Sequence, residues 1–169
     1  AGNEGVMVKN VQGIYKPGSR VGFGVKLKQA LETLDVVIVG AEWGEGKRGK
    51  WLSSFVIAVK DEETDEFVEI GRVGTGIKEK SEEGMSFEQL TQMLLPLVKE
   101  EKGKEVAVKP KLVIEVECEE VQASPTYSAG FALRFPRFIR LRDDKGVDEI
   151  TTLQDVQAMY DAQRGRSKK

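Results

Sequence analysis

The order of the expected elements predicts a mainly β protein. Long β-branched, apolar segments recur between short polar turns, the hydrophobic period changes once to that of a helix, and strands then resume. The expected strands cover 34–44, 51–61, 66–76, 111–121 and 131–142, with helices at 86–101 and from Thr152 onward. Three strands, a helix and two strands is the order of an OB-fold, a five-stranded, partly open Greek-key barrel with a helix between strands 3 and 4. An SH3-like barrel, the competing small β fold, has no place for such a helix.

Local signals support each of these elements. The turns GEGKRGK and EETD separate the first three strands. Ser86 and Gln89 form a capping box that starts the first helix, and Phe87, Leu90 and Leu94 follow with helical spacing. Pro96 should kink or end this helix, because proline lacks the N–H that the helix needs. The last helix lies near the C-terminus and begins at Thr152, with Asp155 three residues later.

The strand at 131–142 carries an unusual arginine cluster. Strand alternation places one set of side chains on one face and the other set on the opposite face. The first set is Phe131, Leu133, Phe135, Arg137, Ile139 and Leu141, and the second is Arg134, Phe138, Arg140 and Arg142. Both faces therefore mix apolar and basic residues. Pro136 must break or bulge the ladder. Pairing of the cluster with the acidic residues of 115–120 is the structural alternative, which we reject here.

The composition excludes several kinds of chemistry. There is no histidine, which removes mechanisms based on a Ser-His or Cys-His pair and any histidine-ligated metal site. Cys118 is the single cysteine, and we expect it to be a small buried strand residue. No apolar run approaches the ~20 residues needed to cross a bilayer, so we expect no membrane partner. No export leader is visible, which leaves the cytoplasm as the default location.

Positive charge is concentrated in two segments. Residues 1–28 hold five basic residues and one acid, and 131–145 hold five basic residues and two acids, although the whole chain has a net charge of −2. We expect two parts of one anion-facing surface. Lys26 and Lys28, two apart on a short strand, point the same way and can meet one polyphosphate. The connector after them divides the chain into a segment 1–30 and a barrel domain 31–169.

Three stretches occur in a fixed order that resembles a known family. They are EGVMVK from Glu4, then the spacing from Arg20 to Lys26 and Lys28, then RFPRFIRLRDDK from Arg134. This set is similar to nucleotidyltransferase motifs IV, V and VI of ATP-dependent DNA ligases, closest to the archaeal and eukaryotic replicative type. GAEWGEGKR, VGTG and SPTYSAG also resemble the OB domain of that family. The resemblance covers nearly the whole chain.

The resemblance implies roles for particular residues. ATP would be contacted by Arg20, Lys26, Lys28, Arg140, Arg142, Asp144 and Lys145. Glu4 would be the motif IV acid near Mg²⁺, a cation that prefers carboxylate and phosphate oxygens. Arg134 and Phe135 would be the DNA-facing pair, with Phe135 as a minor-groove wedge. Lys47 and Arg48, in the loop between the first two strands, would contact the DNA backbone.

The family's chemistry proceeds through a lysyl-AMP and a DNA-adenylate to a sealed nick. The nucleophile is the lysine of a K-x-D-G motif, and this chain contains no K-x-D-G. We therefore expect the end of an adenylation domain followed by a complete OB domain, working with missing domains of a monomeric parent enzyme and inactive in self-adenylation alone. The aromatic residue usual before motif V is replaced by Gly24, beside Phe23. The connector VKLKQALET is the expected hinge.

Two other classes of protein remain open. A free-standing OB-fold nucleic-acid-binding module would not need the basic residues of 1–28. An RNA ligase or capping-type nucleotidyltransferase shares motif V and an R-x-D-K motif VI, although RFPRF and SPTYSAG favour a DNA ligase. The choice of substrate, nicked duplex DNA or RNA ends, separates these classes.

Overall fold

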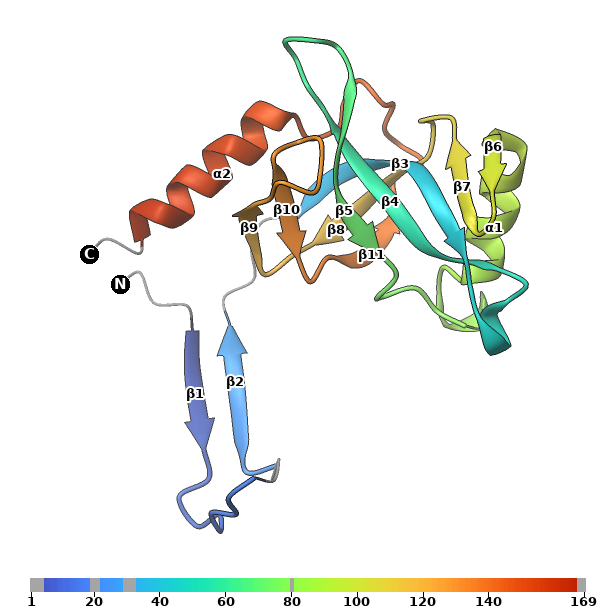
Figure 1. The fold of residues 1–169 in the computed structure, drawn as a ribbon. Coiled ribbons are helices and arrows are strands. Elements are labelled where there is room, and N and C mark those ends of the chain that lie inside the picture. The colour runs from blue at the N-terminus through green and yellow to red at the C-terminus, as the bar shows by residue number, and fades with distance from the viewer. Residues whose placement is uncertain (1–4, 19–21, 29–32, 80, 167–169) are drawn as a thin grey trace.

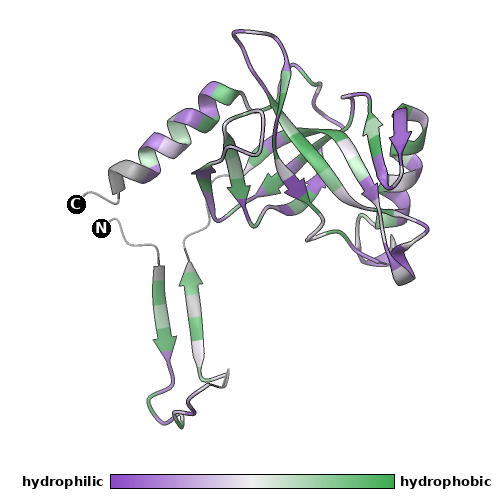
Figure 2. Ribbon diagram, viewed as in Figure 1, coloured by the Kyte–Doolittle hydropathy of each residue, from purple (hydrophilic) through white to green (hydrophobic). Residues whose placement is uncertain are grey.

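The computed structural model describes residues 5–18, 22–28, 33–79 and 81–166 (Figure 1). The first part is an antiparallel hairpin of β1 (Gly5–Lys9) and β2 (Gly24–Lys28). The apolar side chains of both strands are all more than half exposed; they are Val6, Met7, Val8, Val25 and Leu27. Figure 2 shows hydrophobic colour along both strands. The hairpin therefore exposes apolar side chains on both of its faces and has no core of its own.

Five antiparallel strands build the barrel. They lie in the order β11-β8-β3-β4-β5. Their bounds are β3 Leu34–Trp43, β4 Leu52–Lys60, β5 Phe67–Val73, β8 Val113–Glu117 and β11 Arg137–Leu141. A parallel bridge between Thr75, two residues after the end of β5, and Arg137 of β11 closes the barrel. With a helix between β5 and β8, this is the OB-fold that the sequence predicts.

The first helix is shorter than predicted. The capping box of Ser86 and Gln89 is present, and α1 covers Phe87–Leu94. A 3₁₀ turn, η3 (Leu95–Leu97), holds Pro96 and ends the helix. The prediction that Pro96 kinks or ends the helix is confirmed, but the rest of the expected segment to residue 101 is not helical, because β6 (Val98–Lys102) follows and pairs with β7 (Glu105–Val108). Since β7 also pairs with β3, the hairpin extends the barrel sheet, and these backbone bonds replace those of a longer helix.

The expected strand 111–121 is also divided. β8 ends at Glu117, and β9 (Glu120–Ala123) turns away to pair with β10 (Phe131–Arg134). Cys118 lies buried between the two strands. The last helix, α2 (Leu153–Arg166), begins with the predicted contacts, in which the backbone N–H groups of Thr152 and Asp155 donate to each other's side chains. Two further 3₁₀ turns are η1 (Gly46–Arg48) and η2 (Ser81–Glu83).

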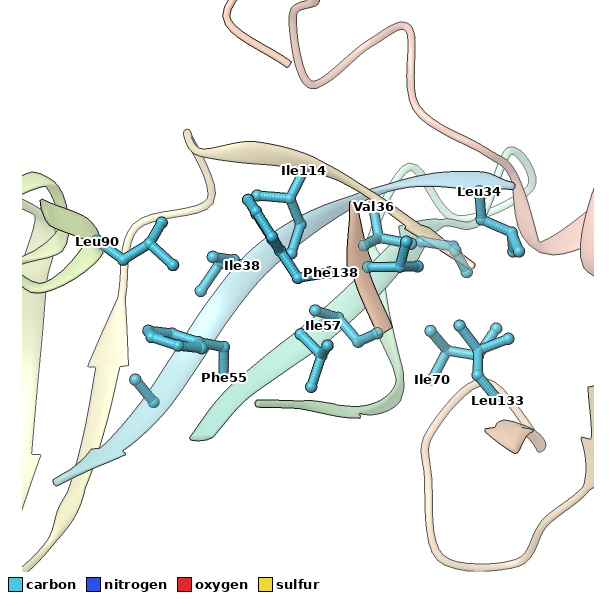
Figure 3. Close-up of a cluster of buried hydrophobic side chains, with 14 of the residues drawn as sticks. Leu34, Val36, Ile38, Phe55, Ile57, Ile70, Leu90, Ile114, Leu133 and Phe138 are labelled. Atoms are coloured by element: carbon cyan, nitrogen blue, oxygen red, sulfur yellow. The ribbon is translucent and has the colours of Figure 1, made fainter. Parts of the chain in front are cut away.

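The barrel core comes from the inward faces of its strands. Leu34, Ile57 and Phe55 are fully buried, and Phe87 and Leu90 of α1 cover one end of the barrel. Figure 3 shows Leu34, Phe55, Ile57 and Leu90 together with Ile114 of β8, Leu133 of β10 and Phe138 of β11. No helix within the described residues is long and apolar enough to span a membrane.

Candidate nucleic-acid and nucleotide interface

The arginine strand is interrupted at Phe135 and Pro136. Phe135 has a backbone φ of +50°, in the left-handed region that a bulky residue occupies only under strain, at a cost of roughly 1–3 kcal/mol. Pro136 lacks an N–H, so no ladder bond is lost at the break. The side chain of Phe135 is 69% exposed. The break therefore directs an aromatic ring into solvent from the junction between β10 and β11.

The residues on either side of the break enter the core. Leu133 at the end of β10 is buried, and so is Phe138 in β11. Figure 3 shows Leu133 beside Ile70 and Phe138 among the side chains of the opposite strands. The prediction that Leu133 and Phe135 share a face, opposite Phe138, is wrong. The left-handed residue shifts the alternation, so that Leu133 and Phe138 point inward while Phe135 points outward.

The loop that contains Thr75 and Gly76 packs against the chain just after the break. The N–H of Phe138 donates to the carbonyl of Thr75 at 2.8 Å. The next residue, Gly76, has a φ of +93°, and a Cβ atom there would lie 2.3 Å from the carbonyl oxygen of Phe138. Only glycine fits this contact. In the sequence, VGTG contributes only to the family resemblance, and its pattern does not identify Gly76 as a residue that places the break.

Arg134 joins Phe135 at this surface. Its guanidinium lies 5.4 Å from the centre of the Phe135 ring and donates to Glu120 at 2.6 Å. Arg140 donates in the same way to Glu115 at 2.5 Å. The rejection of pairing between the arginine cluster and the acids of 115–120 is therefore wrong for these two arginines. The strand register explains it, because Arg134 lies opposite Glu120 and Arg140 opposite Glu115.

A second cluster brings together the predicted motif VI residues. Arg142 donates through Nη1 to Asp35 at 2.8 Å, and through Nε and Nη2 to the two carboxylate oxygens of Asp144 at 2.8 and 2.9 Å. Lys145 donates to the other oxygen of Asp35 at 2.7 Å. The hydrogen bond and charge of Arg142 lower the pKa of Asp144 to about 2. Arg142 and Lys145 are thus held side by side by a shared acid.

Asp35 is a site residue that sequence analysis missed. It lies at the start of β3, directly opposite Glu115 of β8, in an otherwise apolar run. Glu115 also accepts from the hydroxyl of Thr33 at 2.7 Å, and this bond and the one from Arg140 lower its pKa. An aspartate inside LDVVIV was the available signal, since a carboxylate at an inner strand position needs a partner.

The two predicted DNA-contacting residues in the loop between β3 and β4, Lys47 and Arg48, differ in their surroundings. The guanidinium of Arg48 lies 4.8 Å from the centre of the Phe87 ring and donates to Glu79 at 2.6 Å. This arginine therefore anchors η1 to the barrel. Lys47, beside it in η1, is exposed. The loop thus combines one anchored and one exposed cation.

The remaining predicted site residues belong to the N-terminal segment. Glu4 and Arg20 lie outside the described residues. Lys26 and Lys28 occupy alternate positions in β2, opposite Met7 and Gly5, and their side chains are not described. In the described part of the chain, no group of three or more acidic or cysteine side chains is arranged to hold a metal ion.

Comparisons with known proteins agree with this arrangement. A family model described as "ATP dependent DNA ligase C terminal region" matches residues 48–145. A DNA ligase of Nanoarchaeum equitans is 55% identical over 97% of this chain, and one of Archaeoglobus fulgidus is 50% identical over 96%. The chain spans only 29% and 28% of those two proteins.

Solved structures show the same kinship. The ligase domain of M. tuberculosis LigD has a TM-score of 0.58 and 30% identity, over 88% of this chain and 47% of that one. Mycobacterial DNA ligase D complexed with ATP and MES has a TM-score of 0.54 and 28% identity, over 88% of this chain and 46% of that one. The chain belongs to the family of C-terminal regions of ATP-dependent DNA ligases.

Proposed function

We propose that this chain is the DNA-facing and nucleotide-facing C-terminal part of an enzyme that seals nicks in duplex DNA with ATP. The observation that carries the proposal is the strained, exposed Phe135 beside Arg134. Backbone strain of this kind persists where the surrounding structure imposes it, and it clusters at ligand-binding sites. Here the Gly76 loop and the buried Leu133 and Phe138 impose it.

Phe135 and Arg134 are suited to the DNA minor groove. An exposed apolar ring can enter between base steps, while cations next to it contact the backbone. The ion pair of Arg134 with Glu120 has side chains 45% and 32% exposed. Such pairs contribute only about 0–1 kcal/mol, so a phosphate can replace Glu120 as the partner. Lys47 adds a backbone contact from the loop between β3 and β4, and Arg48 supports that loop.

The motif VI cluster is suited to a triphosphate. Arg140, Arg142 and Lys145 place three cations along one end of the barrel, with Asp144 bonded to Arg142. Transfer of a nucleotidyl group depends mainly on positioning and on charge stabilisation by such cations. Arg20, Lys26 and Lys28 complete the nucleotide contacts from the N-terminal segment, and Glu4 contributes to a Mg²⁺ site with phosphate oxygens.

The rest of the enzyme supplies the other half of the site. We infer that residues 1–30 belong to its adenylation domain, because the β1–β2 hairpin exposes apolar side chains on both faces and needs a larger sheet to cover them. The lysine that forms lysyl-AMP comes from that domain, so this chain alone does not adenylate itself. The barrel then serves twice, offering motif VI to ATP and afterwards the Phe135 surface to the nick.

Binding to a fluorescent nicked duplex tests the DNA side of the proposal. With contacts to a few phosphates, affinity should fall roughly tenfold to a hundredfold between ~50 and ~200 mM salt. Arg134→Ala should weaken binding at both salts. Arg72→Ala is the matched control, because Arg72 also forms an ion pair with an acid, Glu42, and its side chain is exposed to about the same extent as that of Arg134.

The result also separates the alternatives. If Arg134→Ala binds the nicked duplex as tightly as Arg72→Ala does, the surface formed by Arg134 and Phe135 does not face DNA. Tighter binding to RNA ends than to nicked DNA would favour an RNA ligase or capping-type enzyme instead.

A further inference from the structure

Asp35 holds two of the motif VI cations, Arg142 and Lys145. Its two carboxylate oxygens are divided between them, with Oδ1 accepting from Arg142 and Oδ2 from Lys145. The Asp35 side chain is 15% exposed and that of Arg142 is 11% exposed, whereas Lys145 is 31% exposed. Asp35 and Arg142 are therefore both largely buried, and Lys145 is the most exposed member of the cluster.

The backbone of Asp35 is fixed at the same place. Its N–H donates to the hydroxyl of Thr151 at 3.1 Å, and its carbonyl accepts from the N–H of Thr151 at 2.9 Å. At the other end of the motif VI loop, the N–H of Arg142 donates to the carbonyl of Val113 on β8 at 2.9 Å. Both ends of the loop from 142 to 151 are thus tied to the two strands that carry Asp35 and Val113.

The contacts leave donors for a ligand. Lysine has three N–H donors and Lys145 gives one to Asp35, so two remain. Arginine has five donors, of which Arg142 gives two to Asp144 and one to Asp35. One N–H therefore remains on each terminal nitrogen of Arg142, and Nη1 also lies 3.9 Å from a carboxylate oxygen of Glu115. The acids fix the direction of the side chains without using up their capacity to bind phosphate oxygens.

We propose that Asp35 is a positioning residue for the adenylation step, which aligns Arg142 and Lys145 with the triphosphate without touching it. This inference rests on the proposed role of motif VI in ATP binding. Long, flexible cationic side chains lose much rotamer freedom when they grip a ligand. A carboxylate that orients both beforehand reduces that loss, and a displacement of about 1 Å at such a site can cost about a hundredfold in rate.

The test is Asp35→Asn in the full-length ligase that carries this chain. The maximal rate of enzyme–AMP formation should fall by about a hundredfold. The ATP concentration at half-saturation should change by less than about threefold, since an amide removes orientation and removes no phosphate contact. Sealing of a nick that already carries AMP should proceed at the parent rate, because no triphosphate takes part in that step. Asp35→Glu, which keeps the carboxylate, should recover part of the adenylation rate.

Two further variants make the outcomes separable. Asp65→Asn is the control, because it removes an acid of equal charge that pairs with Lys60 on the surface, outside the motif VI loop, and it should adenylate at the parent rate. Lys145→Ala should slow adenylation.

If Asp35→Asn adenylates normally while Lys145→Ala is slow, the role of Asp35 is refuted and the proposed function stands. If Lys145→Ala is also normal, the motif VI role itself is refuted. If Asp35→Asn slows both steps equally, Asp35 acts only on stability and the inference is overturned.

Discussion

Phe135 and Phe138 lie three residues apart in one segment, and the structure predicts opposite consequences for removing them. Phe138 is 4% exposed in the barrel core, and Phe135 is 69% exposed. Replacing a buried phenylalanine with alanine costs about 3–5 kcal/mol of unfolding free energy. Phe138→Ala should therefore lower the melting temperature by roughly 6–20 °C, at about 2–4 °C per kcal/mol for a chain of this size.

The cost of Phe135→Ala is much smaller. About a third of the ring is covered, and full burial of phenylalanine is worth about 1.5–3 kcal/mol, so the lost burial is about 0.5–1 kcal/mol. The exposed contact with the Arg134 guanidinium adds about 0.5–1 kcal/mol. The sum is about 1–2 kcal/mol. Phe135→Gly should be at least as stable as Phe135→Ala, because glycine removes the left-handed strain of about 1–2 kcal/mol.

Urea unfolding followed by circular dichroism measures all three variants, and nicked-duplex binding is measured on the same samples. We expect Phe138→Ala to lose stability, and Phe135→Ala to lose DNA affinity while remaining well folded. A loss of about 3 kcal/mol or more of unfolding free energy in Phe135→Ala would refute the reasoning, because a loss of that size is expected only for a ring buried in the core. Phe135→Gly less stable than Phe135→Ala would refute the assignment of strain.

Three further outcomes follow from named contacts. Gly76→Ala should destabilise the chain by about 1–3 kcal/mol in urea unfolding, because a methyl group there meets the carbonyl of Phe138 in a left-handed backbone; an unchanged midpoint contradicts this. The carboxylate of Asp144 should titrate by NMR at about 2, and in Arg142→Ala near the ordinary 3.9, since Arg142 lowers its pKa. Its stabilising effect is present above pH ~4 and lost as the pH falls toward 2; identical midpoints contradict the pairing. Burial raises the pKa of Cys118 to about 11, so a thiol reagent at pH 8 should react slowly until urea is added, and fast reaction in the native chain contradicts its burial.

Much of the barrel could be predicted because its signals are local. The apolar β-branched runs gave β3, β4, β5 and β8, and the capping box of Ser86 gave the start of α1. Pro96 indicated where α1 ends, but the strand that follows could not be predicted, since residues 98–101 were grouped with the helical segment. Their strand forms because β7 offers backbone partners from the edge of β3, which is a tertiary contact.

The candidate site shows the same division. Pro136 in the sequence predicts a break in the arginine strand. Which side chains the break directs outward depends on the left-handed φ of Phe135 and on the close approach of Gly76. Neither is visible in a pattern of alternation. Likewise, Asp35 is 107 residues away from Arg142 along the chain. Only the pairing of β3 with β8 and of β8 with β11 brings that acid into contact with Arg142.

The most direct test of the central claim is site-specific photocrosslinking to a nicked duplex. A benzophenone amino acid replaces Phe135 in one sample and Leu95, an exposed residue of η3 that is 49% accessible, in a second. The account predicts that the probe at position 135 crosslinks to nucleotides close to the nick, and that the probe at position 95 gives only background. Equal crosslinking from both positions, or none from position 135, would contradict the claim that this strand break faces DNA.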